Sequence, residues 1–285
     1  MTQVLSEEFY QELISRNQGI FSVEQQDKLR NARICVIGVG GIGSPVVEIL
    51  ARTGIEHFTI CDKDRFEISN MNRQTFAYTD TVGNRKIDAT EHYLKKINPA
   101  ITVKKHDHVD EENVYEMIKD VNAVIMGADE VKACLTVYRK AREHHIPVLE
   151  GFAVPYANVQ LFTGESMSWE ETYCLGTQER EISSIGPKEE DNLRVQYLMK
   201  FGKLEGLINY YSGETIRDMI EHPSRYHFPN LCIWNFMSAP LIANETLKLL
   251  LDWGILIKSP RMIVFDPYAY RLMLYNLKTG QVKKL

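Results

Sequence analysis

The segment Gly38-Val39-Gly40-Gly41-Ile42-Gly43 has the spacing of a phosphate-binding loop. Glycines at this spacing allow a tight turn between a strand and a helix. They also let phosphates approach the free N–H groups at the helix N-terminus. Asp62 ends the next apolar run, where a carboxylate can accept hydrogen bonds from ribose hydroxyls. The four glycines, Gly38, Gly40, Gly41 and Gly43, and Asp62 therefore predict a nucleotide site.

A dense polar segment follows Asp62 and favours a triphosphate over a nicotinamide dinucleotide. It ends in Arg73-Gln74, and a guanidinium can hold two phosphate oxygens at once. Lys86, at the start of a predicted helix, supplies a second cation. The other candidate nucleotide ligands of the segment are Asp64, Ser69, Asn70, Asn72 and Gln74.

Asp129 ends the fourth predicted strand, at the edge of the sheet where α/β proteins bind ligands. Mg²⁺ prefers carboxylate and phosphate oxygens and keeps several waters, so a carboxylate beside phosphates suits it. We therefore expect ATP and Mg²⁺ as ligands, with Asp129 as the metal ligand and Asp64 as a second candidate.

Short apolar runs alternate with helical segments over the first half of the chain. Such alternation implies a parallel sheet with right-handed crossovers and helices on both faces. The predicted fold class is α/β: a Rossmann-like, doubly wound, mostly parallel sheet with extra strands and a helical C-terminal part. The expected strands cover residues 34–37, 58–61, 101–105, 123–126 and 147–150, and the expected helices cover 45–53, 86–97, 111–120 and 131–143.

Two regions of different character flank this alternation. Residues 6–31 are predicted to form two short helices that begin at Ser6 and Ser22. We divide the chain into N-terminal helices (1–32), an ATP-binding Rossmann-like domain (33–165), and a region that completes the same domain and contacts substrate or a second subunit (166–285). The expected elements after residue 152 are a strand at 159–163, a polar loop or lid at 165–191, helices at 192–222, a buried helix at 231–251 bent or started near Pro240, and strands at 262–265 and 271–275.

The composition excludes several classes of protein. The chain has 285 residues and a formal net charge of −5, and we expect no nucleic-acid partner because phosphate backbones bind clustered Lys and Arg. Every long apolar run is interrupted by charges, so no membrane span is expected. The N-terminus lacks the pattern of a signal peptide, and the five cysteines form no Cys-x-x-Cys pair. These features predict a cytoplasmic protein with reduced thiols.

The combination of motifs resembles the ThiF/MoeB/HesA adenylyltransferases of the ubiquitin-activating enzyme superfamily. The resemblance is good over roughly residues 14–165, and a later run, Ala243 to Lys248, is similar to the late helix of that family. The elements that carry it are the glycine loop, Asp62-x-Asp64, Ser69-Asn70-x-Asn72-Arg73-Gln74, Gly83-x-x-Lys86, Asn98-Pro99 and Asp129.

The resemblance implies that a substrate carboxylate attacks the α-phosphorus of ATP, which forms an acyl-adenylate and releases pyrophosphate. In the family the carboxylate usually belongs to the C-terminal glycine of a ubiquitin-like protein. For this chain a peptide or a small-molecule carboxylate also stays open.

The resemblance also implies roles for individual residues. Gly41 would pack against the nucleotide, Asp62 would hold the ribose, and residues 69–74 would surround the phosphates. The implied catalytic residues are Arg73, Lys86, Asp129 and Arg16. Arg16 matches an N-terminal arginine that reaches the ATP of the other subunit, so a homodimer is expected.

The cysteines depart from the family pattern. Relatives usually carry two Cys-x-x-Cys pairs that bind structural zinc, whereas here Tyr173-Cys174-Leu175 is at most a remnant of the first, so no structural zinc is expected. Relatives that go on to form a thioester use a cysteine in this region, which makes Cys174 the candidate nucleophile. The neighbouring Glu170, Glu171 and Glu179 argue against a reactive thiol.

Other interpretations stay open. A dehydratase of the same superfamily, which activates the carboxylate of a modified tRNA base, would bind RNA with steep salt dependence. An NAD(P)-dependent oxidoreductase would bind NADH and not ATP. A scaffold that binds ATP without turnover would not need Arg73, Lys86 and Asp129 together. His106-x-His108 with Asp110 is interpreted as surface residues at a strand end rather than as a metal site.

Overall fold

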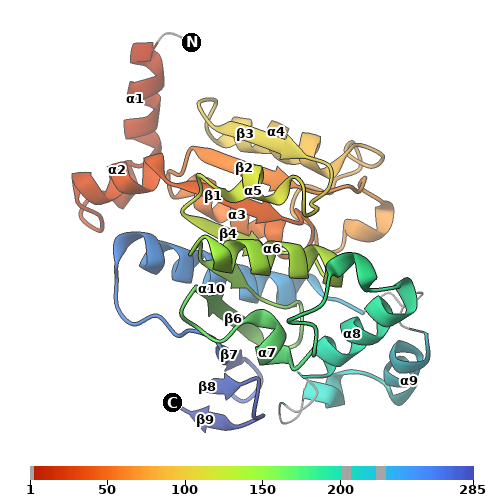
Figure 1. The fold of residues 1–285 in the computed structure, drawn as a ribbon. Helices are drawn as coiled ribbons and strands as arrows, with labels where there is room; N and C mark the ends of the chain where they lie inside the picture. The colour runs from red at the N-terminus through yellow and green to blue at the C-terminus, as the bar shows by residue number, and fades with distance from the viewer. Residues whose placement is uncertain (1–2, 201–203, 205–206, 223–228) are drawn as a thin grey trace.

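The computed structural model describes residues 3–200, 204, 207–222 and 229–285 (Figure 1). Within these residues one sheet runs in the order β3-β2-β1-β4-β5-β6-β7-β8-β9. The strands from β3 to β5 are parallel, and each later strand is antiparallel to its neighbour. The strands are β1 (Arg33–Ile37), β2 (His57–Cys61), β3 (Thr102–His106), β4 (Ala123–Met126), β5 (Val148–Glu150), β6 (Ala157–Phe162), β7 (Arg261–Asp266), β8 (Arg271–Asn276) and β9 (Val282–Lys284).

The parallel half confirms the predicted alternation. β1 lies at its centre, and Ile37 at its end is in register with Cys61 of β2 and Met126 of β4. The loops that follow these three strands therefore leave the sheet at the same edge. The strand order reverses between β1 and β4, and this switch point is where doubly wound sheets bind ligands.

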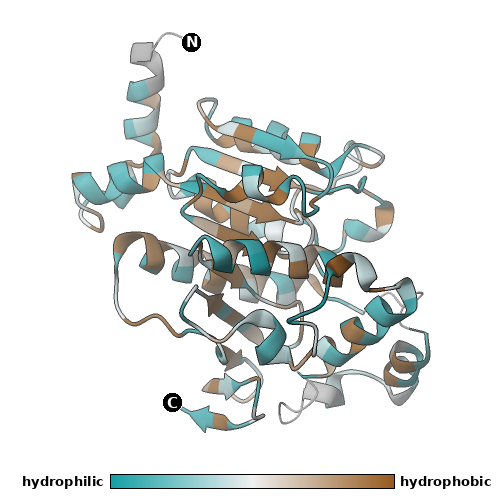
Figure 2. Ribbon diagram, viewed as in Figure 1, coloured by the Kyte–Doolittle hydropathy of each residue, from teal (hydrophilic) through white to brown (hydrophobic). Residues whose placement is uncertain are grey.

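Helices cover both faces of the sheet, and Figure 1 shows α6 and α7 in front of it and α10 behind it. One apolar cluster joins the sheet to α2, α3, α4 and α10, and the other joins it to α5, α6, α7 and α8. Hydrophobic residues concentrate in the central strands, as Figure 2 shows. The helices are α1 (Gln3–Leu13), α2 (Val23–Asn31), α3 (Gly43–Arg52), α4 (Lys86–Ile97), α5 (Val114–Ile118), α6 (Val131–Glu143), α7 (Trp169–Tyr173), α8 (Pro187–Met199), α9 (Gly213–Glu221) and α10 (Cys232–Leu251).

The segment 165–191, predicted as a loop or lid, is irregular over about half of its length and helical over the rest. This segment contains α7, a 3-10 turn at Ile182–Ser184 and the start of α8. Trp169 and Tyr173 of α7 are fully buried, and Trp169 stacks on Tyr138 of α6 with ring centroids 5.2 Å apart. Arg139 of α6 donates two hydrogen bonds to the carboxylate of Glu170 (2.6 and 3.2 Å). The polar residues of the segment therefore surround a packed core element rather than a mobile cover.

Several helices also differ from expectation in their bounds or their course. α1 begins at Gln3 rather than at Ser6, and α5 is shorter than the predicted 111–120. α10 runs without a break through Pro240, whose exposed ring lies on the side of the helix away from the core. The start of α2 is confirmed, because the Ser22 hydroxyl accepts a hydrogen bond from the backbone N–H of Gln25 (3.2 Å).

The C-terminal region adds α10 and β7 to β9 to the same sheet. The predicted strand pair is confirmed as β7 and β8, and β9 was not expected. Part of the predicted helical range, residues 201–203 and 205–206, lies outside the described residues. Among the described helices, none has the length and hydropathy that a membrane span requires.

Candidate active site

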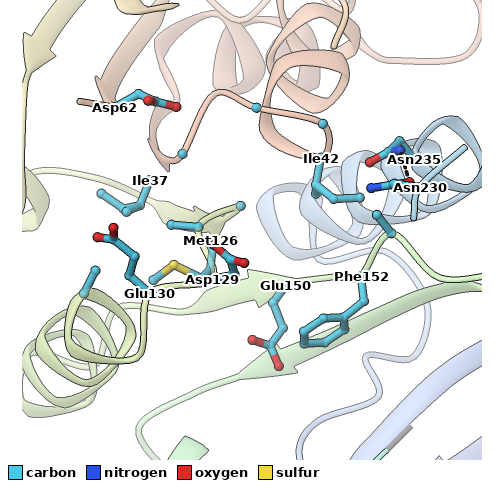
Figure 3. A pocket seen from close by; sticks show the side chains of 18 of the residues that line it. Ile37, Ile42, Asp62, Met126, Asp129, Glu130, Glu150, Phe152, Asn230 and Asn235 are labelled. Carbon is cyan, nitrogen blue, oxygen red and sulfur yellow. Dashed lines mark hydrogen bonds between the residues drawn. The ribbon is translucent and has the colours of Figure 1, made fainter. Parts of the chain in front are cut away.

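A cavity of about 480 Å³ opens at the carboxyl edge of the parallel strands, where the loops after β1, β2, β4 and β5 meet. Figure 3 shows Asp62 and Asn235 on opposite sides of the glycine loop within it. Sequence-predicted site residues that line this cavity are Gly38, Gly40, Gly41, Asp62, Asp64, Arg73, Gln74, Lys86 and Asp129.

Two glycines of the loop are required by the packing of the loop itself. Gly38 has φ +86°, and a Cβ there would lie 2.7 Å from the backbone nitrogen of Ala128. A Cβ at Gly43 would lie 1.9 Å from the carbonyl oxygen of Gly38. Gly43 is not among the residues that line the cavity, so its predicted ligand contact is replaced by a role in packing α3 onto the loop.

The two middle glycines face the cavity in different ways. A Cβ at Gly40 would meet nothing closer than Gln74 Nε2 at 3.7 Å, so this part of the backbone is open to a ligand. A Cβ at Gly41 would lie 2.5 Å from Oδ1 of Asn235, on α10. Gly41 is therefore needed for contact with the last helix of the chain, which the sequence did not indicate.

Asp62 fixes the loop geometry as well as lining the cavity. Its Oδ2 accepts a hydrogen bond from the backbone N–H of Val39 (3.0 Å), and its Oδ1 accepts one from the N–H of Asp64 (2.9 Å). Burial raises the pKa of this carboxyl, and the nearby Lys86 ammonium opposes the shift. The carboxylate keeps free lone pairs that can accept hydrogen bonds from ribose hydroxyls.

Lys86 is a buried cation at an unusual position. It is the first residue of α4, where the helix dipole disfavours positive charge, and its side chain is almost fully buried. Its Nζ lies 2.7 Å from Oδ2 of the half-exposed Asp64. The half-exposed carboxylate of Asp64 thus holds the ammonium at the cavity wall, where a second anion can also bind to it.

Arg73 is a half-buried cation with neutral partners. Its guanidinium donates hydrogen bonds to the carbonyl oxygen of Ser69 (2.9 Å) and to Oδ1 of Asn72 (2.8 Å). Burial lowers its pKa, and no carboxylate of the described residues forms an ion pair with it. A partly desolvated guanidinium without a counter-charge is a binding group for an anion.

The structure gives Ser69, Asn70 and Asn72 supporting roles instead of cavity-lining ones. Ser69 and Asn70 lie in the 3-10 turn Ile68–Asn70, and Oδ1 of Asn70 accepts a hydrogen bond from the N–H of Glu67 (3.2 Å). Asn72 donates a hydrogen bond to the carbonyl oxygen of Asn230 (3.2 Å). Ser69 and Asn72 hold the guanidinium of Arg73 in place. The role of the three residues around the phosphates stays a prediction.

Asp129 lies at the mouth of the cavity and forms an ion pair with Arg194 of α8. Glu190, one turn earlier in α8, accepts a hydrogen bond from the N–H of Lys132 at the start of α6 (3.1 Å). α8 is therefore attached beside the end of β4 by two contacts. Sequence reasoning missed Arg194 because no local pattern links it to Asp129.

Glu150 is a fully buried carboxyl at the end of β5, in the wall of the cavity. It accepts hydrogen bonds from the hydroxyls of Tyr138 (2.5 Å) and Tyr173 (2.6 Å) and from the indole N–H of Trp169 (3.2 Å). Burial raises its pKa to about 7, against the opposing effect of these donors. The sequence contained a signal for this residue, namely a carboxylate that ends an otherwise apolar strand.

Arg16 and Cys174 are not among the residues that line the cavity. Arg16 is exposed in the 3-10 turn Ser15–Asn17. Cys174 is exposed at the end of α7, with its sulfur 3.1 Å from Nζ of Lys200. Glu170 is close to Cys174 in sequence, but its carboxylate is buried in an ion pair with Arg139.

The two histidines of the His106-x-His108 pair have different surroundings. His106 is the last residue of β3, and His108 lines the cavity with its imidazole 3.1 Å from the carboxylate of Asp110. Within the part of the chain that the structure describes, no three His, Cys, Asp or Glu side chains are grouped to hold a metal ion. The place of His108 in the cavity wall was not predicted from the sequence.

Comparison with known proteins agrees with this architecture. The ThiF family model matches residues 14–284, and the chain belongs to the ThiF family. In the solved structures, MccB of E. coli with ATP is similar over 93% of this chain and 71% of its own, with a TM-score of 0.68 and 21% identity. That likeness shows a shared fold.

Curated relatives match over part of their length. The tRNA threonylcarbamoyladenosine dehydratase of Haemophilus influenzae is 37% identical over 136 residues, which are 46% of this chain and 52% of the relative. The molybdopterin-synthase adenylyltransferase of Salmonella typhimurium is 30% identical over 149 residues, or 50% of this chain and 60% of the relative. The aligned part thus spans about half the length of these relatives.

Proposed function

We propose that this protein is an ATP-dependent adenylyltransferase that activates a carboxylate as an acyl-adenylate. One observation carries the proposal: the half-buried Arg73 guanidinium faces the cavity beside the glycine loop with only neutral partners among the described residues. An anion is the ligand that this arrangement favours. Family membership and a relative named as an adenylyltransferase support ATP as that anion.

In the proposed reaction a carboxylate oxygen of the acceptor bonds to the α-phosphorus of ATP. The bond from the α-phosphorus to the bridging oxygen breaks, and pyrophosphate leaves with that oxygen. Gly40 lets the phosphates approach the backbone, and Asp62 accepts hydrogen bonds from the ribose. Arg73 and Lys86 neutralise the charge that moves onto the phosphates, so the protein acts by positioning and electrostatics.

Mg²⁺ fits the proposed site as a ligand shared between protein and phosphates. Asp129 offers an exposed carboxylate at the cavity mouth. A single protein carboxylate is in keeping with the preference of Mg²⁺ for phosphate oxygens and water. When bound, the ion would neutralise phosphate charge, and Arg194 would share Asp129 with it.

We further propose a homodimer in which Arg16 acts on the site of the other subunit. Two features support this arrangement. Arg16 is exposed and outside the cavity of its own chain. The first turns of α10 expose Leu231, Ile233 and Phe236, an apolar surface that a second copy can cover. The proposed location is the cytoplasm, where ATP is available.

ATP–pyrophosphate exchange tests the proposed function. We expect exchange that depends on a carboxylate when a panel of peptides, ubiquitin-like proteins and small acids is added with Mg-ATP. Failure of the purified protein to bind ATP, or tight binding of NADH in its place, would refute the proposal.

A second candidate has support from one relative, the tRNA threonylcarbamoyladenosine dehydratase. A dehydratase of this kind would use the same phosphate-binding site to activate a carboxylate on tRNA. Tight tRNA binding whose affinity falls steeply with salt would favour it, since phosphate contacts release counterions. The formal net charge of −5 argues against such binding.

A further inference from the structure

Three asparagines link the first turn of α10 to the guanidinium of Arg73. Asn235 lies on α10, Asn230 comes just before this helix, and Asn72 precedes Arg73 in the loop after β2. Asn230, Asn235 and Arg73 line the cavity. The link therefore joins a distant part of the chain to the cation that carries the proposed function.

Asn235 is the fixed end of this link. It is fully buried, and its Nδ2 donates hydrogen bonds to the carbonyl oxygen of Leu231 (2.9 Å) and to Oδ1 of Asn230 (2.7 Å), the second of which is drawn in Figure 3. Its own Oδ1 packs against Gly41, where a Cβ would lie 2.5 Å away. Asn235 thus holds the side chain of Asn230 beside the glycine loop.

The backbone carbonyl of Asn230 sets the orientation of the Asn72 amide. Nδ2 of Asn72 donates a hydrogen bond to this carbonyl oxygen (3.2 Å). A carbonyl oxygen can only accept, so the amide nitrogen must face Asn230, and this leaves Oδ1 of Asn72 for Arg73. A flipped amide would place its own N–H groups against a guanidinium, which has no acceptor.

The guanidinium of Arg73 is fixed at one of its nitrogens. Nη1 donates hydrogen bonds to the carbonyl oxygen of Ser69 (2.9 Å) and to Oδ1 of Asn72 (2.8 Å). Nε and Nη2 form no hydrogen bond with the described residues. These two nitrogens share one edge of the planar group and can bind two oxygens of a phosphate at once. The link therefore holds Nη1 and leaves the Nε–Nη2 edge for an anion.

We infer that Asn230 is a positioning residue of the proposed reaction, which acts through Asn72 to orient the Arg73 guanidinium toward the phosphates. The inference rests on the proposed function. A donor that is already oriented needs no reorganisation when charge moves onto the phosphates. Without the Asn230 side chain, its backbone is released from Asn235, the Asn72 amide can turn, and the guanidinium loses one of its two fixed acceptors.

The affinities for ATP and for adenosine, measured by calorimetry, test this role. Asn230→Ala should raise the Kd for ATP by about three- to tenfold, the effect of one lost hydrogen bond. The Kd for adenosine, which carries no phosphate, should not change, because Asp62 stays in place. Asn244→Ala is the matched control, since Asn244 is exposed on α10, and should change neither value.

Two outcomes of this comparison would overturn the inference. An unchanged Kd for ATP would show that Asn230 does not position the guanidinium, and an equal loss for ATP and adenosine would show that it only supports the shape of the cavity. A wild-type protein that does not bind ATP would instead refute the proposed function itself.

A double-mutant cycle shows whether the effect passes through Arg73. In an Arg73→Ala protein, Asn230→Ala should change the Kd for ATP by less than about twofold, because the group that it orients is gone. The same loss in both backgrounds would contradict the inference. Asn230→Ser keeps a polar side chain at this partly buried position but is too short to hold Asn235, so it serves for both measurements if the alanine variant does not fold.

Discussion

Arg73 is the side chain on which the proposed chemistry depends most. Arg73→Ala should lower ATP–pyrophosphate exchange by at least about a hundredfold, as loss of one preorganised charge donor does elsewhere. Arg73→Lys keeps the charge but cannot bridge two phosphate oxygens, so an intermediate rate is expected. Exchange kinetics at saturating acceptor measure both. Unchanged exchange in Arg73→Ala would mean that the guanidinium does not serve the phosphates.

The raised pKa of Glu150 predicts that the stability of the fold depends on pH. Its pKa is about 7 in the folded state against 4.5 for an ordinary Glu, so between these values the folded state binds more protons than the unfolded one. The free energy of unfolding should therefore fall as pH rises from about 4.5 to 7, by about 3 kcal/mol from this group. In Glu150→Gln this contribution should be absent.

Urea unfolding at pH 5 and pH 8 measures this contribution. The exposed Glu179→Gln variant serves as the control and should keep the wild-type pH dependence. If wild type and Glu150→Gln lost the same free energy over this range, the carboxyl would not be the titrating group.

At the scale of residues, local spacing was enough to predict part of the site. The glycine loop, Arg73 and Lys86 lie within one stretch of chain, and the structure brings them to one cavity. Arg194, which pairs with Asp129, and Asn235, which lines the cavity, could not be predicted, because each is positioned only by the packing of a distant helix. Ser69 and Asn72 contact Arg73 and do not line the cavity, and polar type alone does not distinguish a ligand from such a supporting residue.

Among the helices, α8 has the most direct link to the proposed metal ligand. Arg194→Ala removes the cation that shares Asp129, so the Mg²⁺ concentration for half-maximal exchange should fall by about two- to fivefold, the range of a partly exposed ion pair. Arg180→Ala is the control: it removes a different ion pair of α8, with Glu189, and leaves Asp129 untouched. A higher Mg²⁺ requirement in Arg194→Ala would show that Arg194 supports the metal rather than competes with it.

At the scale of elements, periodicity was sufficient where strands and helices alternate. α4 and β4 have the predicted bounds, since an amphipathic stripe and a short apolar run are unambiguous signals. α7 was missed because its burial depends on contacts with distant segments, such as those of Trp169 with Tyr138 and of Tyr173 with Tyr197. A five-residue helix has too few turns to show a period.

The whole assembly can be tested by mixing inactive subunits. Arg16→Ala and Arg73→Ala should each be inactive alone if Arg16 acts on the partner's site. Each mixed dimer then contains one intact site out of two. About half of the dimers in an equal mixture are mixed, so the mixture should recover about a quarter of the wild-type exchange. Light scattering confirms the dimer independently. A monomer, or a mixture without recovery, would contradict the arrangement in trans.

For the whole molecule, the doubly wound, mostly parallel sheet followed from alternation and handedness, whereas the order of its strands was not predicted. The antiparallel extension was only partly foreseen, because β9 is a short exposed strand with little apolar content. Part of the cavity wall is formed by α8, α9 and α10, which come from the region where periodicity is weakest.

The contact between Gly41 and Asn235 ties the first βα turn of the fold to its last helix. Any residue larger than glycine at position 41 would require a smaller side chain at position 235. Recombination that exchanged C-terminal halves between homologues would therefore disturb the nucleotide loop unless both positions changed together. Positions 41 and 235 are therefore expected to be inherited together.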